Sequence, residues 1–544
     1  MLNDQFCSVF SDPSKEPAKI HESKRIPTMN NIKVNIRGVE KLMANINPNK
    51  ATGPDEIPGK VLKLGAKELA PTLSMLFQAS LDQGKVPDDW KAANIVPLFK
   101  KGDKTCPENY RPVSLTSITC KLLEHIVHST IMDHFEANQI LIEVQHGFRQ
   151  KRSCETQLIT TCSDFIQNIE KKSQTDAILL DFSKAFDKVH HGSLLNKLEF
   201  YGIRNNTYLW IKSFLSERTQ KVLVDGTESP LRSVKSGVPQ GTVLGPLLFL
   251  TYINDMPNGL SEGTKLRLFA DDSLLYREIR TERDSKILQE DLNKLQEWER
   301  NWQMEFHPQK CQVLRITNKT KPITADYFIH ECKLGTEDHA KYLGITLDGK
   351  MTWTTHINNT CTKANKALGF IKRHLSSCPP KVKQQCYESY VRPIVEYSGT
   401  VWDPHQIGDI KKIEKIQRSA ARFVTNQYDY NTPSSKILKE LDWVPLEERR
   451  ARSKVTLIKR AELDLVKIPT EDLKLKKNNT RRAAHSYELP RSRTNSHLHS
   501  FFPSSIRLWN NLPNNIREIK TIDTFKLNLQ GVTLRSNYFE DRRI

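Results

Sequence analysis

The sequence has no apolar run long enough to cross a lipid bilayer. The longest run, Leu244 to Ile253, is interrupted by Gly245, Pro246 and Thr251, whereas a membrane-spanning helix needs about 20 apolar residues. Met1 is followed by polar and acidic residues rather than by the basic and apolar stretch of a secretory signal. We therefore expect an intracellular protein, of the nucleus or the cytoplasm, that is not secreted and does not bind a membrane.

Cysteine patterns that bind metals are also missing. The ten cysteines form no CxxC pair and have no histidine partner at the spacing of zinc ligands. The sequence therefore predicts no zinc knuckle. Free thiols in a reducing compartment are the default interpretation.

Negative charge is scarce in the last third of the chain. Residues 351–544 contain 35 Lys and Arg against 19 Asp and Glu, a net charge of +16 out of +19 for the whole sequence. Such a basic region is expected to neutralise the phosphates of a nucleic acid in a salt-sensitive way. The alternative, for the separate runs Lys411 to Lys415 and Arg449 to Arg452, is that they form a solvated helix face.

Three of the acidic residues form a distinctive pattern. Asp271 and Asp272 interrupt two apolar stretches, 266–269 and 274–276, as the tip of a β-hairpin does. Asp181 lies 90 residues before Asp271 and follows Ala177 to Leu180, an apolar run typical of a buried strand. A charge at the end of such a strand is expected to point into a cleft.

Three converging carboxylates repel one another unless cations lie between them. Hard oxygen ligands favour Mg²⁺, with Mn²⁺ as an alternative, and two such ions suit nucleotidyl transfer. The competing interpretation is that Asp-Asp is ordinary turn chemistry and that Asp181 merely ends a strand. Further segments, which surround these carboxylates in a definite order, favour the metal site.

Seven segments carry a resemblance to a known family. They are NYRPVSLTSITCKLLE from Asn109, HGFRQKRS from His146, ILLDFSKAFDKVHH from Ile178, SGVPQGTVLGPLLFLTYINDMP from Ser236, LFADDSLLY from Leu268, FHPQKCQVL from Phe306 and KYLGITLD from Lys341. With them, residues from about Ile95 to Leu347 resemble the reverse transcriptase of non-LTR (LINE-type) retrotransposons, in particular the jockey-like group. The resemblance implies copying of RNA into DNA, with an RNA template, a DNA primer and deoxynucleoside triphosphates as partners.

The resemblance also implies an α+β fold of the right-hand polymerase type. The predicted division is an N-terminal linker and extension at 1–94, fingers and palm with an antiparallel sheet at 95–347, a helical thumb at 348–404 and a basic helical C-terminal region at 405–544. Residues 1 to about 30 are polar with scattered prolines and are expected to be loose. Helices are predicted at Val39 to Ile46 and Gly65 to Leu81.

Position by position, the family pattern assigns roles around the carboxylates. Asp181 and Asp271 resemble the metal-binding carboxylates, Asp272 resembles a supporting third ligand, and Phe182 would add its backbone carbonyl. Phe186, five residues after Asp181, resembles the aromatic gate that excludes a 2′-hydroxyl. The alternative for Phe186 is a core aromatic on a helix that follows the strand.

Other candidates surround the incoming nucleotide. The glycine-rich loop at Gln240 and Gly241 resembles the family loop at the nascent base pair, and also fits a turn that enters a helix. Arg111, Lys121 and Arg149 are the candidate cations for the triphosphate, although Lys121 also fits a solvated helix face.

Two candidates lie after the hairpin of paired aspartates. Lys310 resembles a lysine that assists the leaving pyrophosphate, and the alternative is a surface lysine. Tyr342, Leu343 and Gly344 resemble the hairpin that grips the primer terminus, where glycine would permit close approach of the sugar-phosphate backbone.

Relatives in this family carry an endonuclease ahead of the polymerase, whereas only about ninety residues precede Trp90 here. We therefore expect the chain to begin in the linker, with the nuclease in a missing upstream domain or in a partner. Two rival functions remain. An RNA-copying RNA polymerase would use Asp187 to read a 2′-hydroxyl, and a decayed remnant would bind nucleic acid without turnover.

Overall fold

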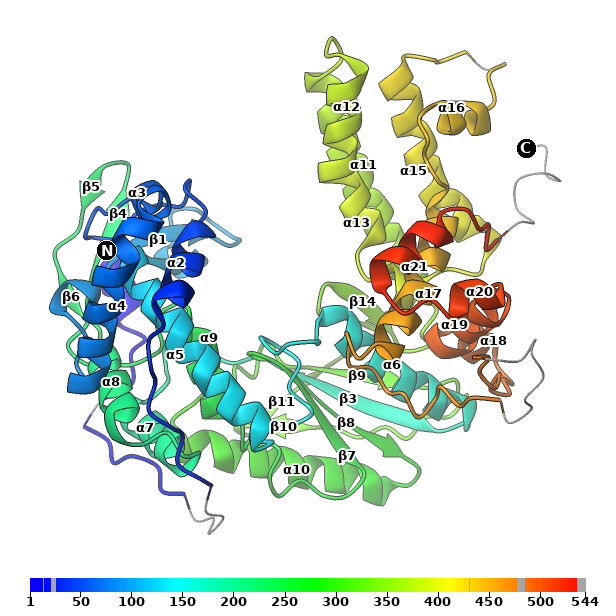
Figure 1. Ribbon diagram of the computed structural model, residues 1–544. Helices are drawn as coiled ribbons and strands as arrows, with labels where there is room; N and C mark the ends of the chain where they lie inside the picture. Colours follow the sequence, from blue (N-terminus) through cyan, green and yellow to red (C-terminus); the bar gives the residue numbers. More distant parts are fainter. Residues whose placement is uncertain (13, 21–25, 430, 477–484, 536–544) are drawn as a thin grey trace.

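The computed structural model describes residues 1–12, 14–20, 26–429, 431–476 and 485–535. It has a mixed α+β architecture, as expected from the sequence. Two arms of the chain rise from opposite ends of a central β-sheet (Figure 1). Most of residues 1–137 and 191–233 form one arm, and the helices after residue 353 form the other.

The central sheet has five strands in the order β12-β9-β3-β8-β7. Its strands are β3 (Gln174–Leu180), β7 (Thr264–Phe269), β8 (Asp272–Ile279), β9 (Gln312–Ile316) and β12 (Gly335–Glu337). All neighbouring pairs are antiparallel except β12 and β9. The strand that ends before Asp181 is therefore the middle strand of the sheet.

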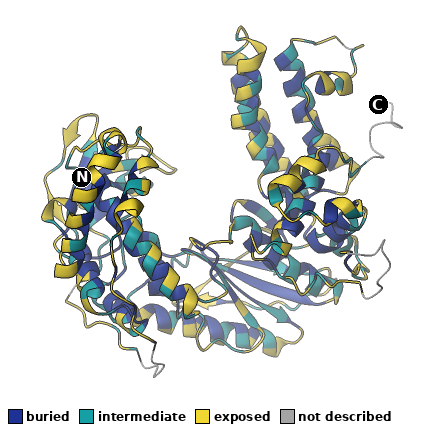
Figure 2. Cartoon of the chain, viewed as in Figure 1, coloured by how far each residue is buried: buried dark blue, intermediate teal, exposed yellow. Residues whose placement is uncertain are grey.

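Both faces of this sheet are covered, which explains the unbroken apolar run of β3. Ile178 and Leu180 belong to one hydrophobic cluster with α9 (Leu244–Ile253) and α10 (Glu282–Asn301). Ala177 belongs to a second cluster with α6 (Cys154–Glu170) and the C-terminal helices. Successive strand residues point to opposite faces, so the second half of β3, Ala177 to Leu180, is apolar at every position. The strands are correspondingly dark in the burial view (Figure 2).

The N-terminal arm combines a second sheet with helices. Strand β1 pairs antiparallel with β2 and parallel with β4, and β4 also pairs with β5 and β6. The strands are β1 (Ala92–Phe99), β2 (Tyr110–Leu115), β4 (Thr219–Val224), β5 (Thr227–Glu228) and β6 (Arg232–Ser233). The helices are α1 (Leu2–Cys7), α2 (Ile36–Ala44), α3 (Gly59–Leu64), α4 (Ala66–Gln83), α5 (Ile118–Ala137), α7 (His191–Phe200) and α8 (Asn205–Leu215). Helices α2 and α4 match the two predicted near the start of the chain.

The described residues before position 30 are more ordered than the sequence predicted. Phe6 of α1 is 4% exposed and packs on β1 and β4. Ile26 and Met29 are buried in the main core of this arm. A few apolar side chains spaced among polar ones anchor this segment, and local composition does not reveal such anchors.

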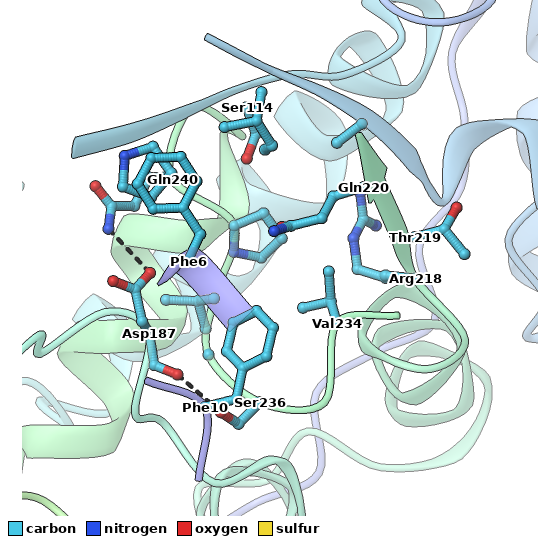
Figure 3. Close-up of a pocket in the computed structure, with 16 residues that line it drawn as sticks. Phe6, Phe10, Ser114, Asp187, Arg218, Thr219, Gln220, Val234, Ser236 and Gln240 are labelled. Atoms are coloured by element: carbon cyan, nitrogen blue, oxygen red, sulfur yellow. Dashed lines mark hydrogen bonds between the residues drawn. The ribbon is translucent and has the colours of Figure 1, made fainter. Parts of the chain in front are cut away.

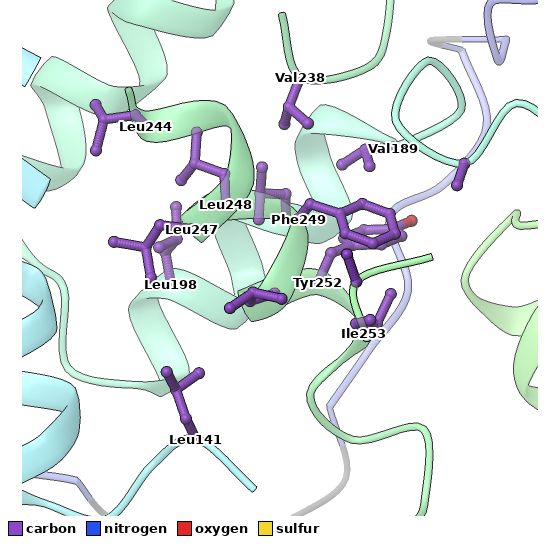
Figure 4. Packing of buried hydrophobic residues seen from close by; sticks show 14 of the residues in the cluster. Leu141, Val189, Leu198, Val238, Leu244, Leu247, Leu248, Phe249, Tyr252 and Ile253 are labelled. Atoms are coloured by element: carbon purple, nitrogen blue, oxygen red, sulfur yellow. The ribbon is translucent and has the colours of Figure 1, made fainter. Parts of the chain in front are cut away.

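The longest apolar run of the sequence is the buried helix α9. Its neighbours come from several elements (Figure 4), including Leu141, Val189, Leu198 and Val238. A helix that is apolar on all sides belongs in the interior of a protein. Within the described residues, no helix is both long and apolar enough to cross a membrane.

The C-terminal arm is helical, after the hairpin of β13 (His339–Tyr342) and β14 (Ile345–Asp348). Its helices are α11 (Thr354–His374), α12 (Pro380–Cys386), α13 (Arg392–Glu396), α14 (Gly399–Trp402), α15 (Ile407–Thr425), α16 (Ser434–Glu440), α17 (Leu446–Glu462), α18 (Asn495–Leu498), α19 (Phe501–Asn510), α20 (Asn514–Arg517) and α21 (Ile522–Leu529). Helices α11 and α15 lie side by side. Helices on both sides of residue 404 share one hydrophobic cluster.

Candidate active site

The acidic hairpin forms as the sequence predicts. Strands β7 and β8 pair up to Phe269 and Asp272, which leaves Ala270 and Asp271 as a two-residue turn. Ala270 has a φ of 55°, the left-handed conformation that tight hairpin turns require. Asp271 therefore projects from the turn, and Asp272 is the first residue of β8.

Asp181 lies next to this turn. The last paired residues of β3 and β8 are Leu180 and Ser273, and one further step along both strands places Asp181 opposite Asp272. Opposite residues in an antiparallel ladder are about 4.5 to 5.5 Å apart at Cα, with both side chains on the same face. Carboxylates from two separate segments therefore meet at one edge of the sheet.

The charges at this edge repel one another. The pKa of Asp272 is raised to about 6 by partial loss of hydration and then by the negative charges of Asp271 and Asp181. Desolvation also raises the pKa of Asp271, against the opposing positive charges of Arg111 and Lys100. The ends of these strands, with their three carboxylates, are expected to attract cations.

The donor chemistry suits a hard divalent ion, since all three side chains offer carboxylate oxygens. Among the residues that the structure describes, no group of three or more His, Cys, Asp and Glu side chains is close enough to form a ready metal site.

Lys310 is the cation nearest to Asp181. Its Nζ lies 3.3 Å from Asp181 Oδ2, and both side chains are about half exposed, at 53% and 45%. The turn that carries Lys310 precedes β9 and is closed by a hydrogen bond from Lys310 N to the His307 carbonyl. An exposed pair of this kind contributes little stability, so Lys310 remains free to move toward a ligand.

Phe182 packs against the segment that contains Phe306. Its ring stacks on Phe306 at a centroid distance of 4.6 Å, and the two residues form an isolated antiparallel bridge. The hydrogen bonds of this bridge run through the residues on either side, from Ser183 N to the Glu305 carbonyl and from His307 N to the Asp181 carbonyl. The Phe182 carbonyl therefore points away from Phe306.

Phe186 does not lie on a helix. It occupies the turn between β3 and α7, which begins only at His191. Its half-buried ring stacks on Phe249 of α9 with a centroid distance of 4.3 Å and an interplanar angle of 18°. The ring is therefore held against a rigid core helix, five residues after Asp181.

The loop around Gln240 packs tightly on protein backbone. Gly241 has a φ of 114°, and a Cβ there would lie 2.5 Å from the Ser114 carbonyl oxygen. The Gln240 carbonyl accepts a hydrogen bond from Ser114 N at 2.8 Å, and Gln240 Nε2 donates to Asp187 Oδ1 at 3.1 Å. Burial raises the pKa of Asp187. Glycine at 241 is thus required by strand β2.

The three candidate cations for a triphosphate have different surroundings. Arg111, on β2, is exposed, and its charge acts on Asp271 and Asp272. Burial lowers the pKa of Lys121. Among the charges that act on Lys121, that of Glu124 is the largest, and the three candidate metal-binding carboxylates are not among them. Arg149 is buried and engaged by protein partners. Its guanidinium donates to the Leu141 and Ile142 carbonyls and pairs with Glu136 at 3.1 Å.

Tyr342, Leu343 and Gly344 form a tight hairpin between β13 and β14. Leu343 and Gly344 have φ values of 43° and 85°, which fits a type I′ turn. The Tyr342 hydroxyl accepts a hydrogen bond from Gln157 at 3.1 Å. The close neighbour of Gly344 is Tyr397, whose ring would lie 2.9 Å from an added Cβ, and whose hydroxyl donates to the Leu343 carbonyl.

Two groups near the site escaped sequence reasoning. Glu124 is fully buried on α5 and accepts hydrogen bonds from Val243 N and Leu244 N, at the start of α9. Lys100, just after β1, contributes positive charge to the carboxylate edge. Glu124 ends the segment quoted from Asn109, but only the folded chain shows that its carboxylate meets the start of α9, and only the folded chain brings Lys100 near the carboxylates.

Comparison with known proteins agrees with this geometry. Residues 99–347 match the family model described as reverse transcriptase (RNA-dependent DNA polymerase). Residues 99–347 of this chain therefore form a domain of the reverse transcriptase class.

Curated relatives narrow this class. The chain is 29% identical to the probable RNA-directed DNA polymerase from transposon BS of Drosophila melanogaster, over 77% of this chain and 47% of the relative. It is also 29% identical to the RNA-directed DNA polymerase from mobile element jockey of the same organism, over 72% of this chain and 44% of the relative. A third relative, the probable RNA-directed DNA polymerase from transposon X-element, is 28% identical over 71% and 43%.

The chain thus spans about half the length of the curated relatives it matches. It carries a reverse transcriptase domain and is related to the polymerases of jockey-like non-LTR retrotransposons. The resemblance found in the sequence is confirmed.

Proposed function

We propose that this chain is the RNA-directed DNA polymerase of a non-LTR retrotransposon, which extends a DNA 3′ end on an RNA template. In this proposal the N-terminal arm supplies the fingers, the central sheet is the palm, and the helices from α11 onward form the thumb and the basic C-terminal region. The proposal is supported by the register of β3 and β8, which continues from Leu180 and Ser273 to Asp181 and Asp272, and by the negative charges of Asp181 and Asp271 that act on Asp272.

Asp181, Asp271 and Asp272, with the Phe182 carbonyl, would hold two divalent ions, Mg²⁺ in the first instance and Mn²⁺ as the alternative. When bound, such ions stabilise the attacking and leaving oxygens of an in-line phosphoryl transfer. The surroundings of the carboxylates support this assignment: desolvation is the first cause of the raised pKa values of Asp271 and Asp272, the negative charge of Asp181 adds to both, and a bound cation would relieve this repulsion.

Basic side chains of this chain would then bind and neutralise the triphosphate. Arg111 is exposed near the carboxylates and offers a permanent charge to the incoming phosphates. Lys310, paired loosely with Asp181, would turn toward the leaving pyrophosphate and neutralise it. Lys121 and Arg149 would contribute only by exchanging their present surroundings for the ligand, so we propose direct contact for Arg111 first.

Selection for deoxyribose would come from Phe186. Its ring is backed by Phe249, so it cannot retreat easily when a 2′-hydroxyl approaches. The RNA polymerase alternative needs Asp187 to face the sugar, but the Asp187 carboxylate accepts a hydrogen bond from Gln240, and Asp187 lines a cavity together with Phe6 and Phe10. This orientation favours DNA synthesis over RNA synthesis.

The remaining partners follow from the charge and the family. The net +16 of residues 351–544 would bind the template and primer duplex through phosphate contacts, with the hairpin at Tyr342 to Gly344 next to the primer end.

The decisive experiment is primer extension on an RNA template by an Asp271→Asn variant. We expect magnesium-dependent synthesis to be lost, while binding of the template and primer stays close to that of the parent chain. Asp326→Asn is the matched control, because Asp326 forms an exposed ion pair with Lys333. Retained synthesis by Asp271→Asn would refute the metal assignment. A parent chain that binds the duplex without extending it would identify the decayed remnant.

A further inference from the structure

The first residues of the chain lie against the rear of the proposed nucleotide site. Helix α1 is anchored by Asn3, which is 3% exposed. Its side chain donates to Ser229 Oγ and the Pro230 carbonyl at 2.9 and 2.8 Å, and accepts from Gln220 Nε2 at 3.0 Å. Fully bonded buried amides hold one geometry. The helix is therefore fixed to the β4–β6 part of the second sheet.

Phe6 and Phe10 from this segment line a narrow cavity of about 40 Å³. Asp187 and Gln240 line the same cavity (Figure 3). Phe6 also packs on Ala93, Ile95 and Val222. The two aromatic rings thus back the loop and the turn that carry the proposed nucleotide contacts.

Hydrogen bonds connect the segment to both parts of the site. Ser11 N donates to Ser236 Oγ at 2.7 Å, and Ser236 Oγ donates to the Asp187 carbonyl at 2.8 Å. Ser11 Oγ donates to the Lys188 carbonyl at 2.7 Å. Ser236 begins the Gln240 loop, whereas Asp187 and Lys188 follow Phe186. Ser11 therefore bonds to both, over sequence separations of 225 and 177 residues.

The same network reaches the Gln240 side chain. Asp187 Oδ1 accepts from Gln240 Nε2, so a shift of Asp187 would release the Gln240 amide. The Phe186 and Asp187 carbonyls both lie 2.8 Å from a Cβ built on Gly237, which means that the loop and the turn cannot move independently. Close packing of this kind transmits a displacement from one segment to the next.

We propose that residues 2–11 are an N-terminal brace of the nucleotide site, in which Phe10, Ser11 and Ser236 are positioning residues. The brace fixes Asp187, and through it the amide of Gln240 and the ring of Phe186. This proposal rests on the proposed function, because it assigns a role within the same site. In this proposal residues 2–11 are part of the polymerase structure and not part of a flexible linker.

Two single variants of the full chain test the brace. Phe10→Ala removes one ring from the cavity, and Ser236→Ala removes the hydroxyl that links Ser11 to Asp187. Ser8→Ala is the matched control, because Ser8 lies on the same segment, is exposed, and its hydroxyl donates to the Gln5 carbonyl of that segment. Hydrogen–deuterium exchange of residues 184–189 and 236–241 should increase in both test variants and stay unchanged in the control.

In primer extension with each nucleotide varied in turn, we expect both variants to raise the KM for deoxynucleotides by about tenfold, the scale of a small misplacement. Discrimination against ribonucleotides should fall as well. Unchanged exchange in the two segments would overturn the brace. Increased exchange with an unchanged KM would overturn its role in positioning. A parent chain without polymerase activity would refute the proposed function. Hydrogen–deuterium exchange needs no turnover, so it would still test whether residues 2–11 hold the two segments in place.

Discussion

Replacing Asp403 by asparagine should destabilise the C-terminal arm by about 3 to 5 kcal/mol, the scale for breaking a buried ion pair. The Asp403 side chain is 2% exposed, and its carboxylate lies 2.8 Å from Arg450 Nε, 2.9 Å from Lys454 Nζ and 2.5 Å from Arg535 Nη2. Asparagine keeps the shape of the side chain but leaves these three cations without their central anion.

The assay is urea unfolding followed by tryptophan fluorescence, because Trp402, Trp443 and Trp509 all lie in the same hydrophobic cluster. Glu388→Gln is the control, since Glu388 pairs with Arg392 one helical turn away at 3.5 Å near the surface. Its loss should be about 0.5 kcal/mol. An Asp403→Asn variant no less stable than this control would refute the structural role of the buried cluster.

The stability that is lost in the Asp403→Asn variant should also depend on pH. Burial alone would raise the pKa of Asp403, but the charges of Lys454, Arg535 and Arg450 prevail and hold its pKa well below the usual range. The stabilisation is therefore complete above the unfolded-state pKa of about 3.9 and is lost as the pH falls toward the folded-state pKa. The stability difference between the parent and Asp403→Asn should be constant near neutral pH and should shrink below about pH 4.

Three further predictions concern the site. Phe186→Val should admit ribonucleotides because the ring against Phe249 is lost, whereas Phe186→Tyr should keep the deoxynucleotide preference; an unchanged ratio of ribonucleotide to deoxynucleotide use by the valine variant would remove Phe186 from the gate. Lys310→Ala should lower kcat by about 10²-fold with KM little changed, and an unaffected single-turnover rate would count against its role at pyrophosphate. Gly344→Ala should cost about 1 to 3 kcal/mol more than Gly226→Ala in urea unfolding, since both have positive φ but only Gly344 has a ring within 4 Å; equal losses would contradict the contact with Tyr397.

Patterns within short segments predicted the centre of the site. The apolar run before Asp181 identified the middle strand, and the paired aspartates between apolar flanks identified the hairpin. Both signals are local, because strand burial and turn chemistry act over a few residues. The start of α9 at the Gly245-Pro246 step is local for the same reason.

Residues whose roles depend on distant partners were harder to assign. Arg149 resembles a ligand for phosphate in the sequence, yet its guanidinium is held by Glu136 and two carbonyls. The glycine at 344 suits close approach of a primer, whereas its neighbour in the structure is Tyr397. A single residue type fits either environment, and only the folded chain selects one.

The sequence by itself determined which residues are chemically competent here: three carboxylates, an aromatic after the first, and a basic C-terminal third. Tertiary structure decided which of them meet. It brought Asp181 opposite Asp272 through strand pairing, joined α15 to α11 across residue 404 through a shared core, and seated the first residues of the chain behind Gln240. Contacts between segments hundreds of residues apart depend on shape and burial summed over the whole chain, and these leave no periodicity in any one segment.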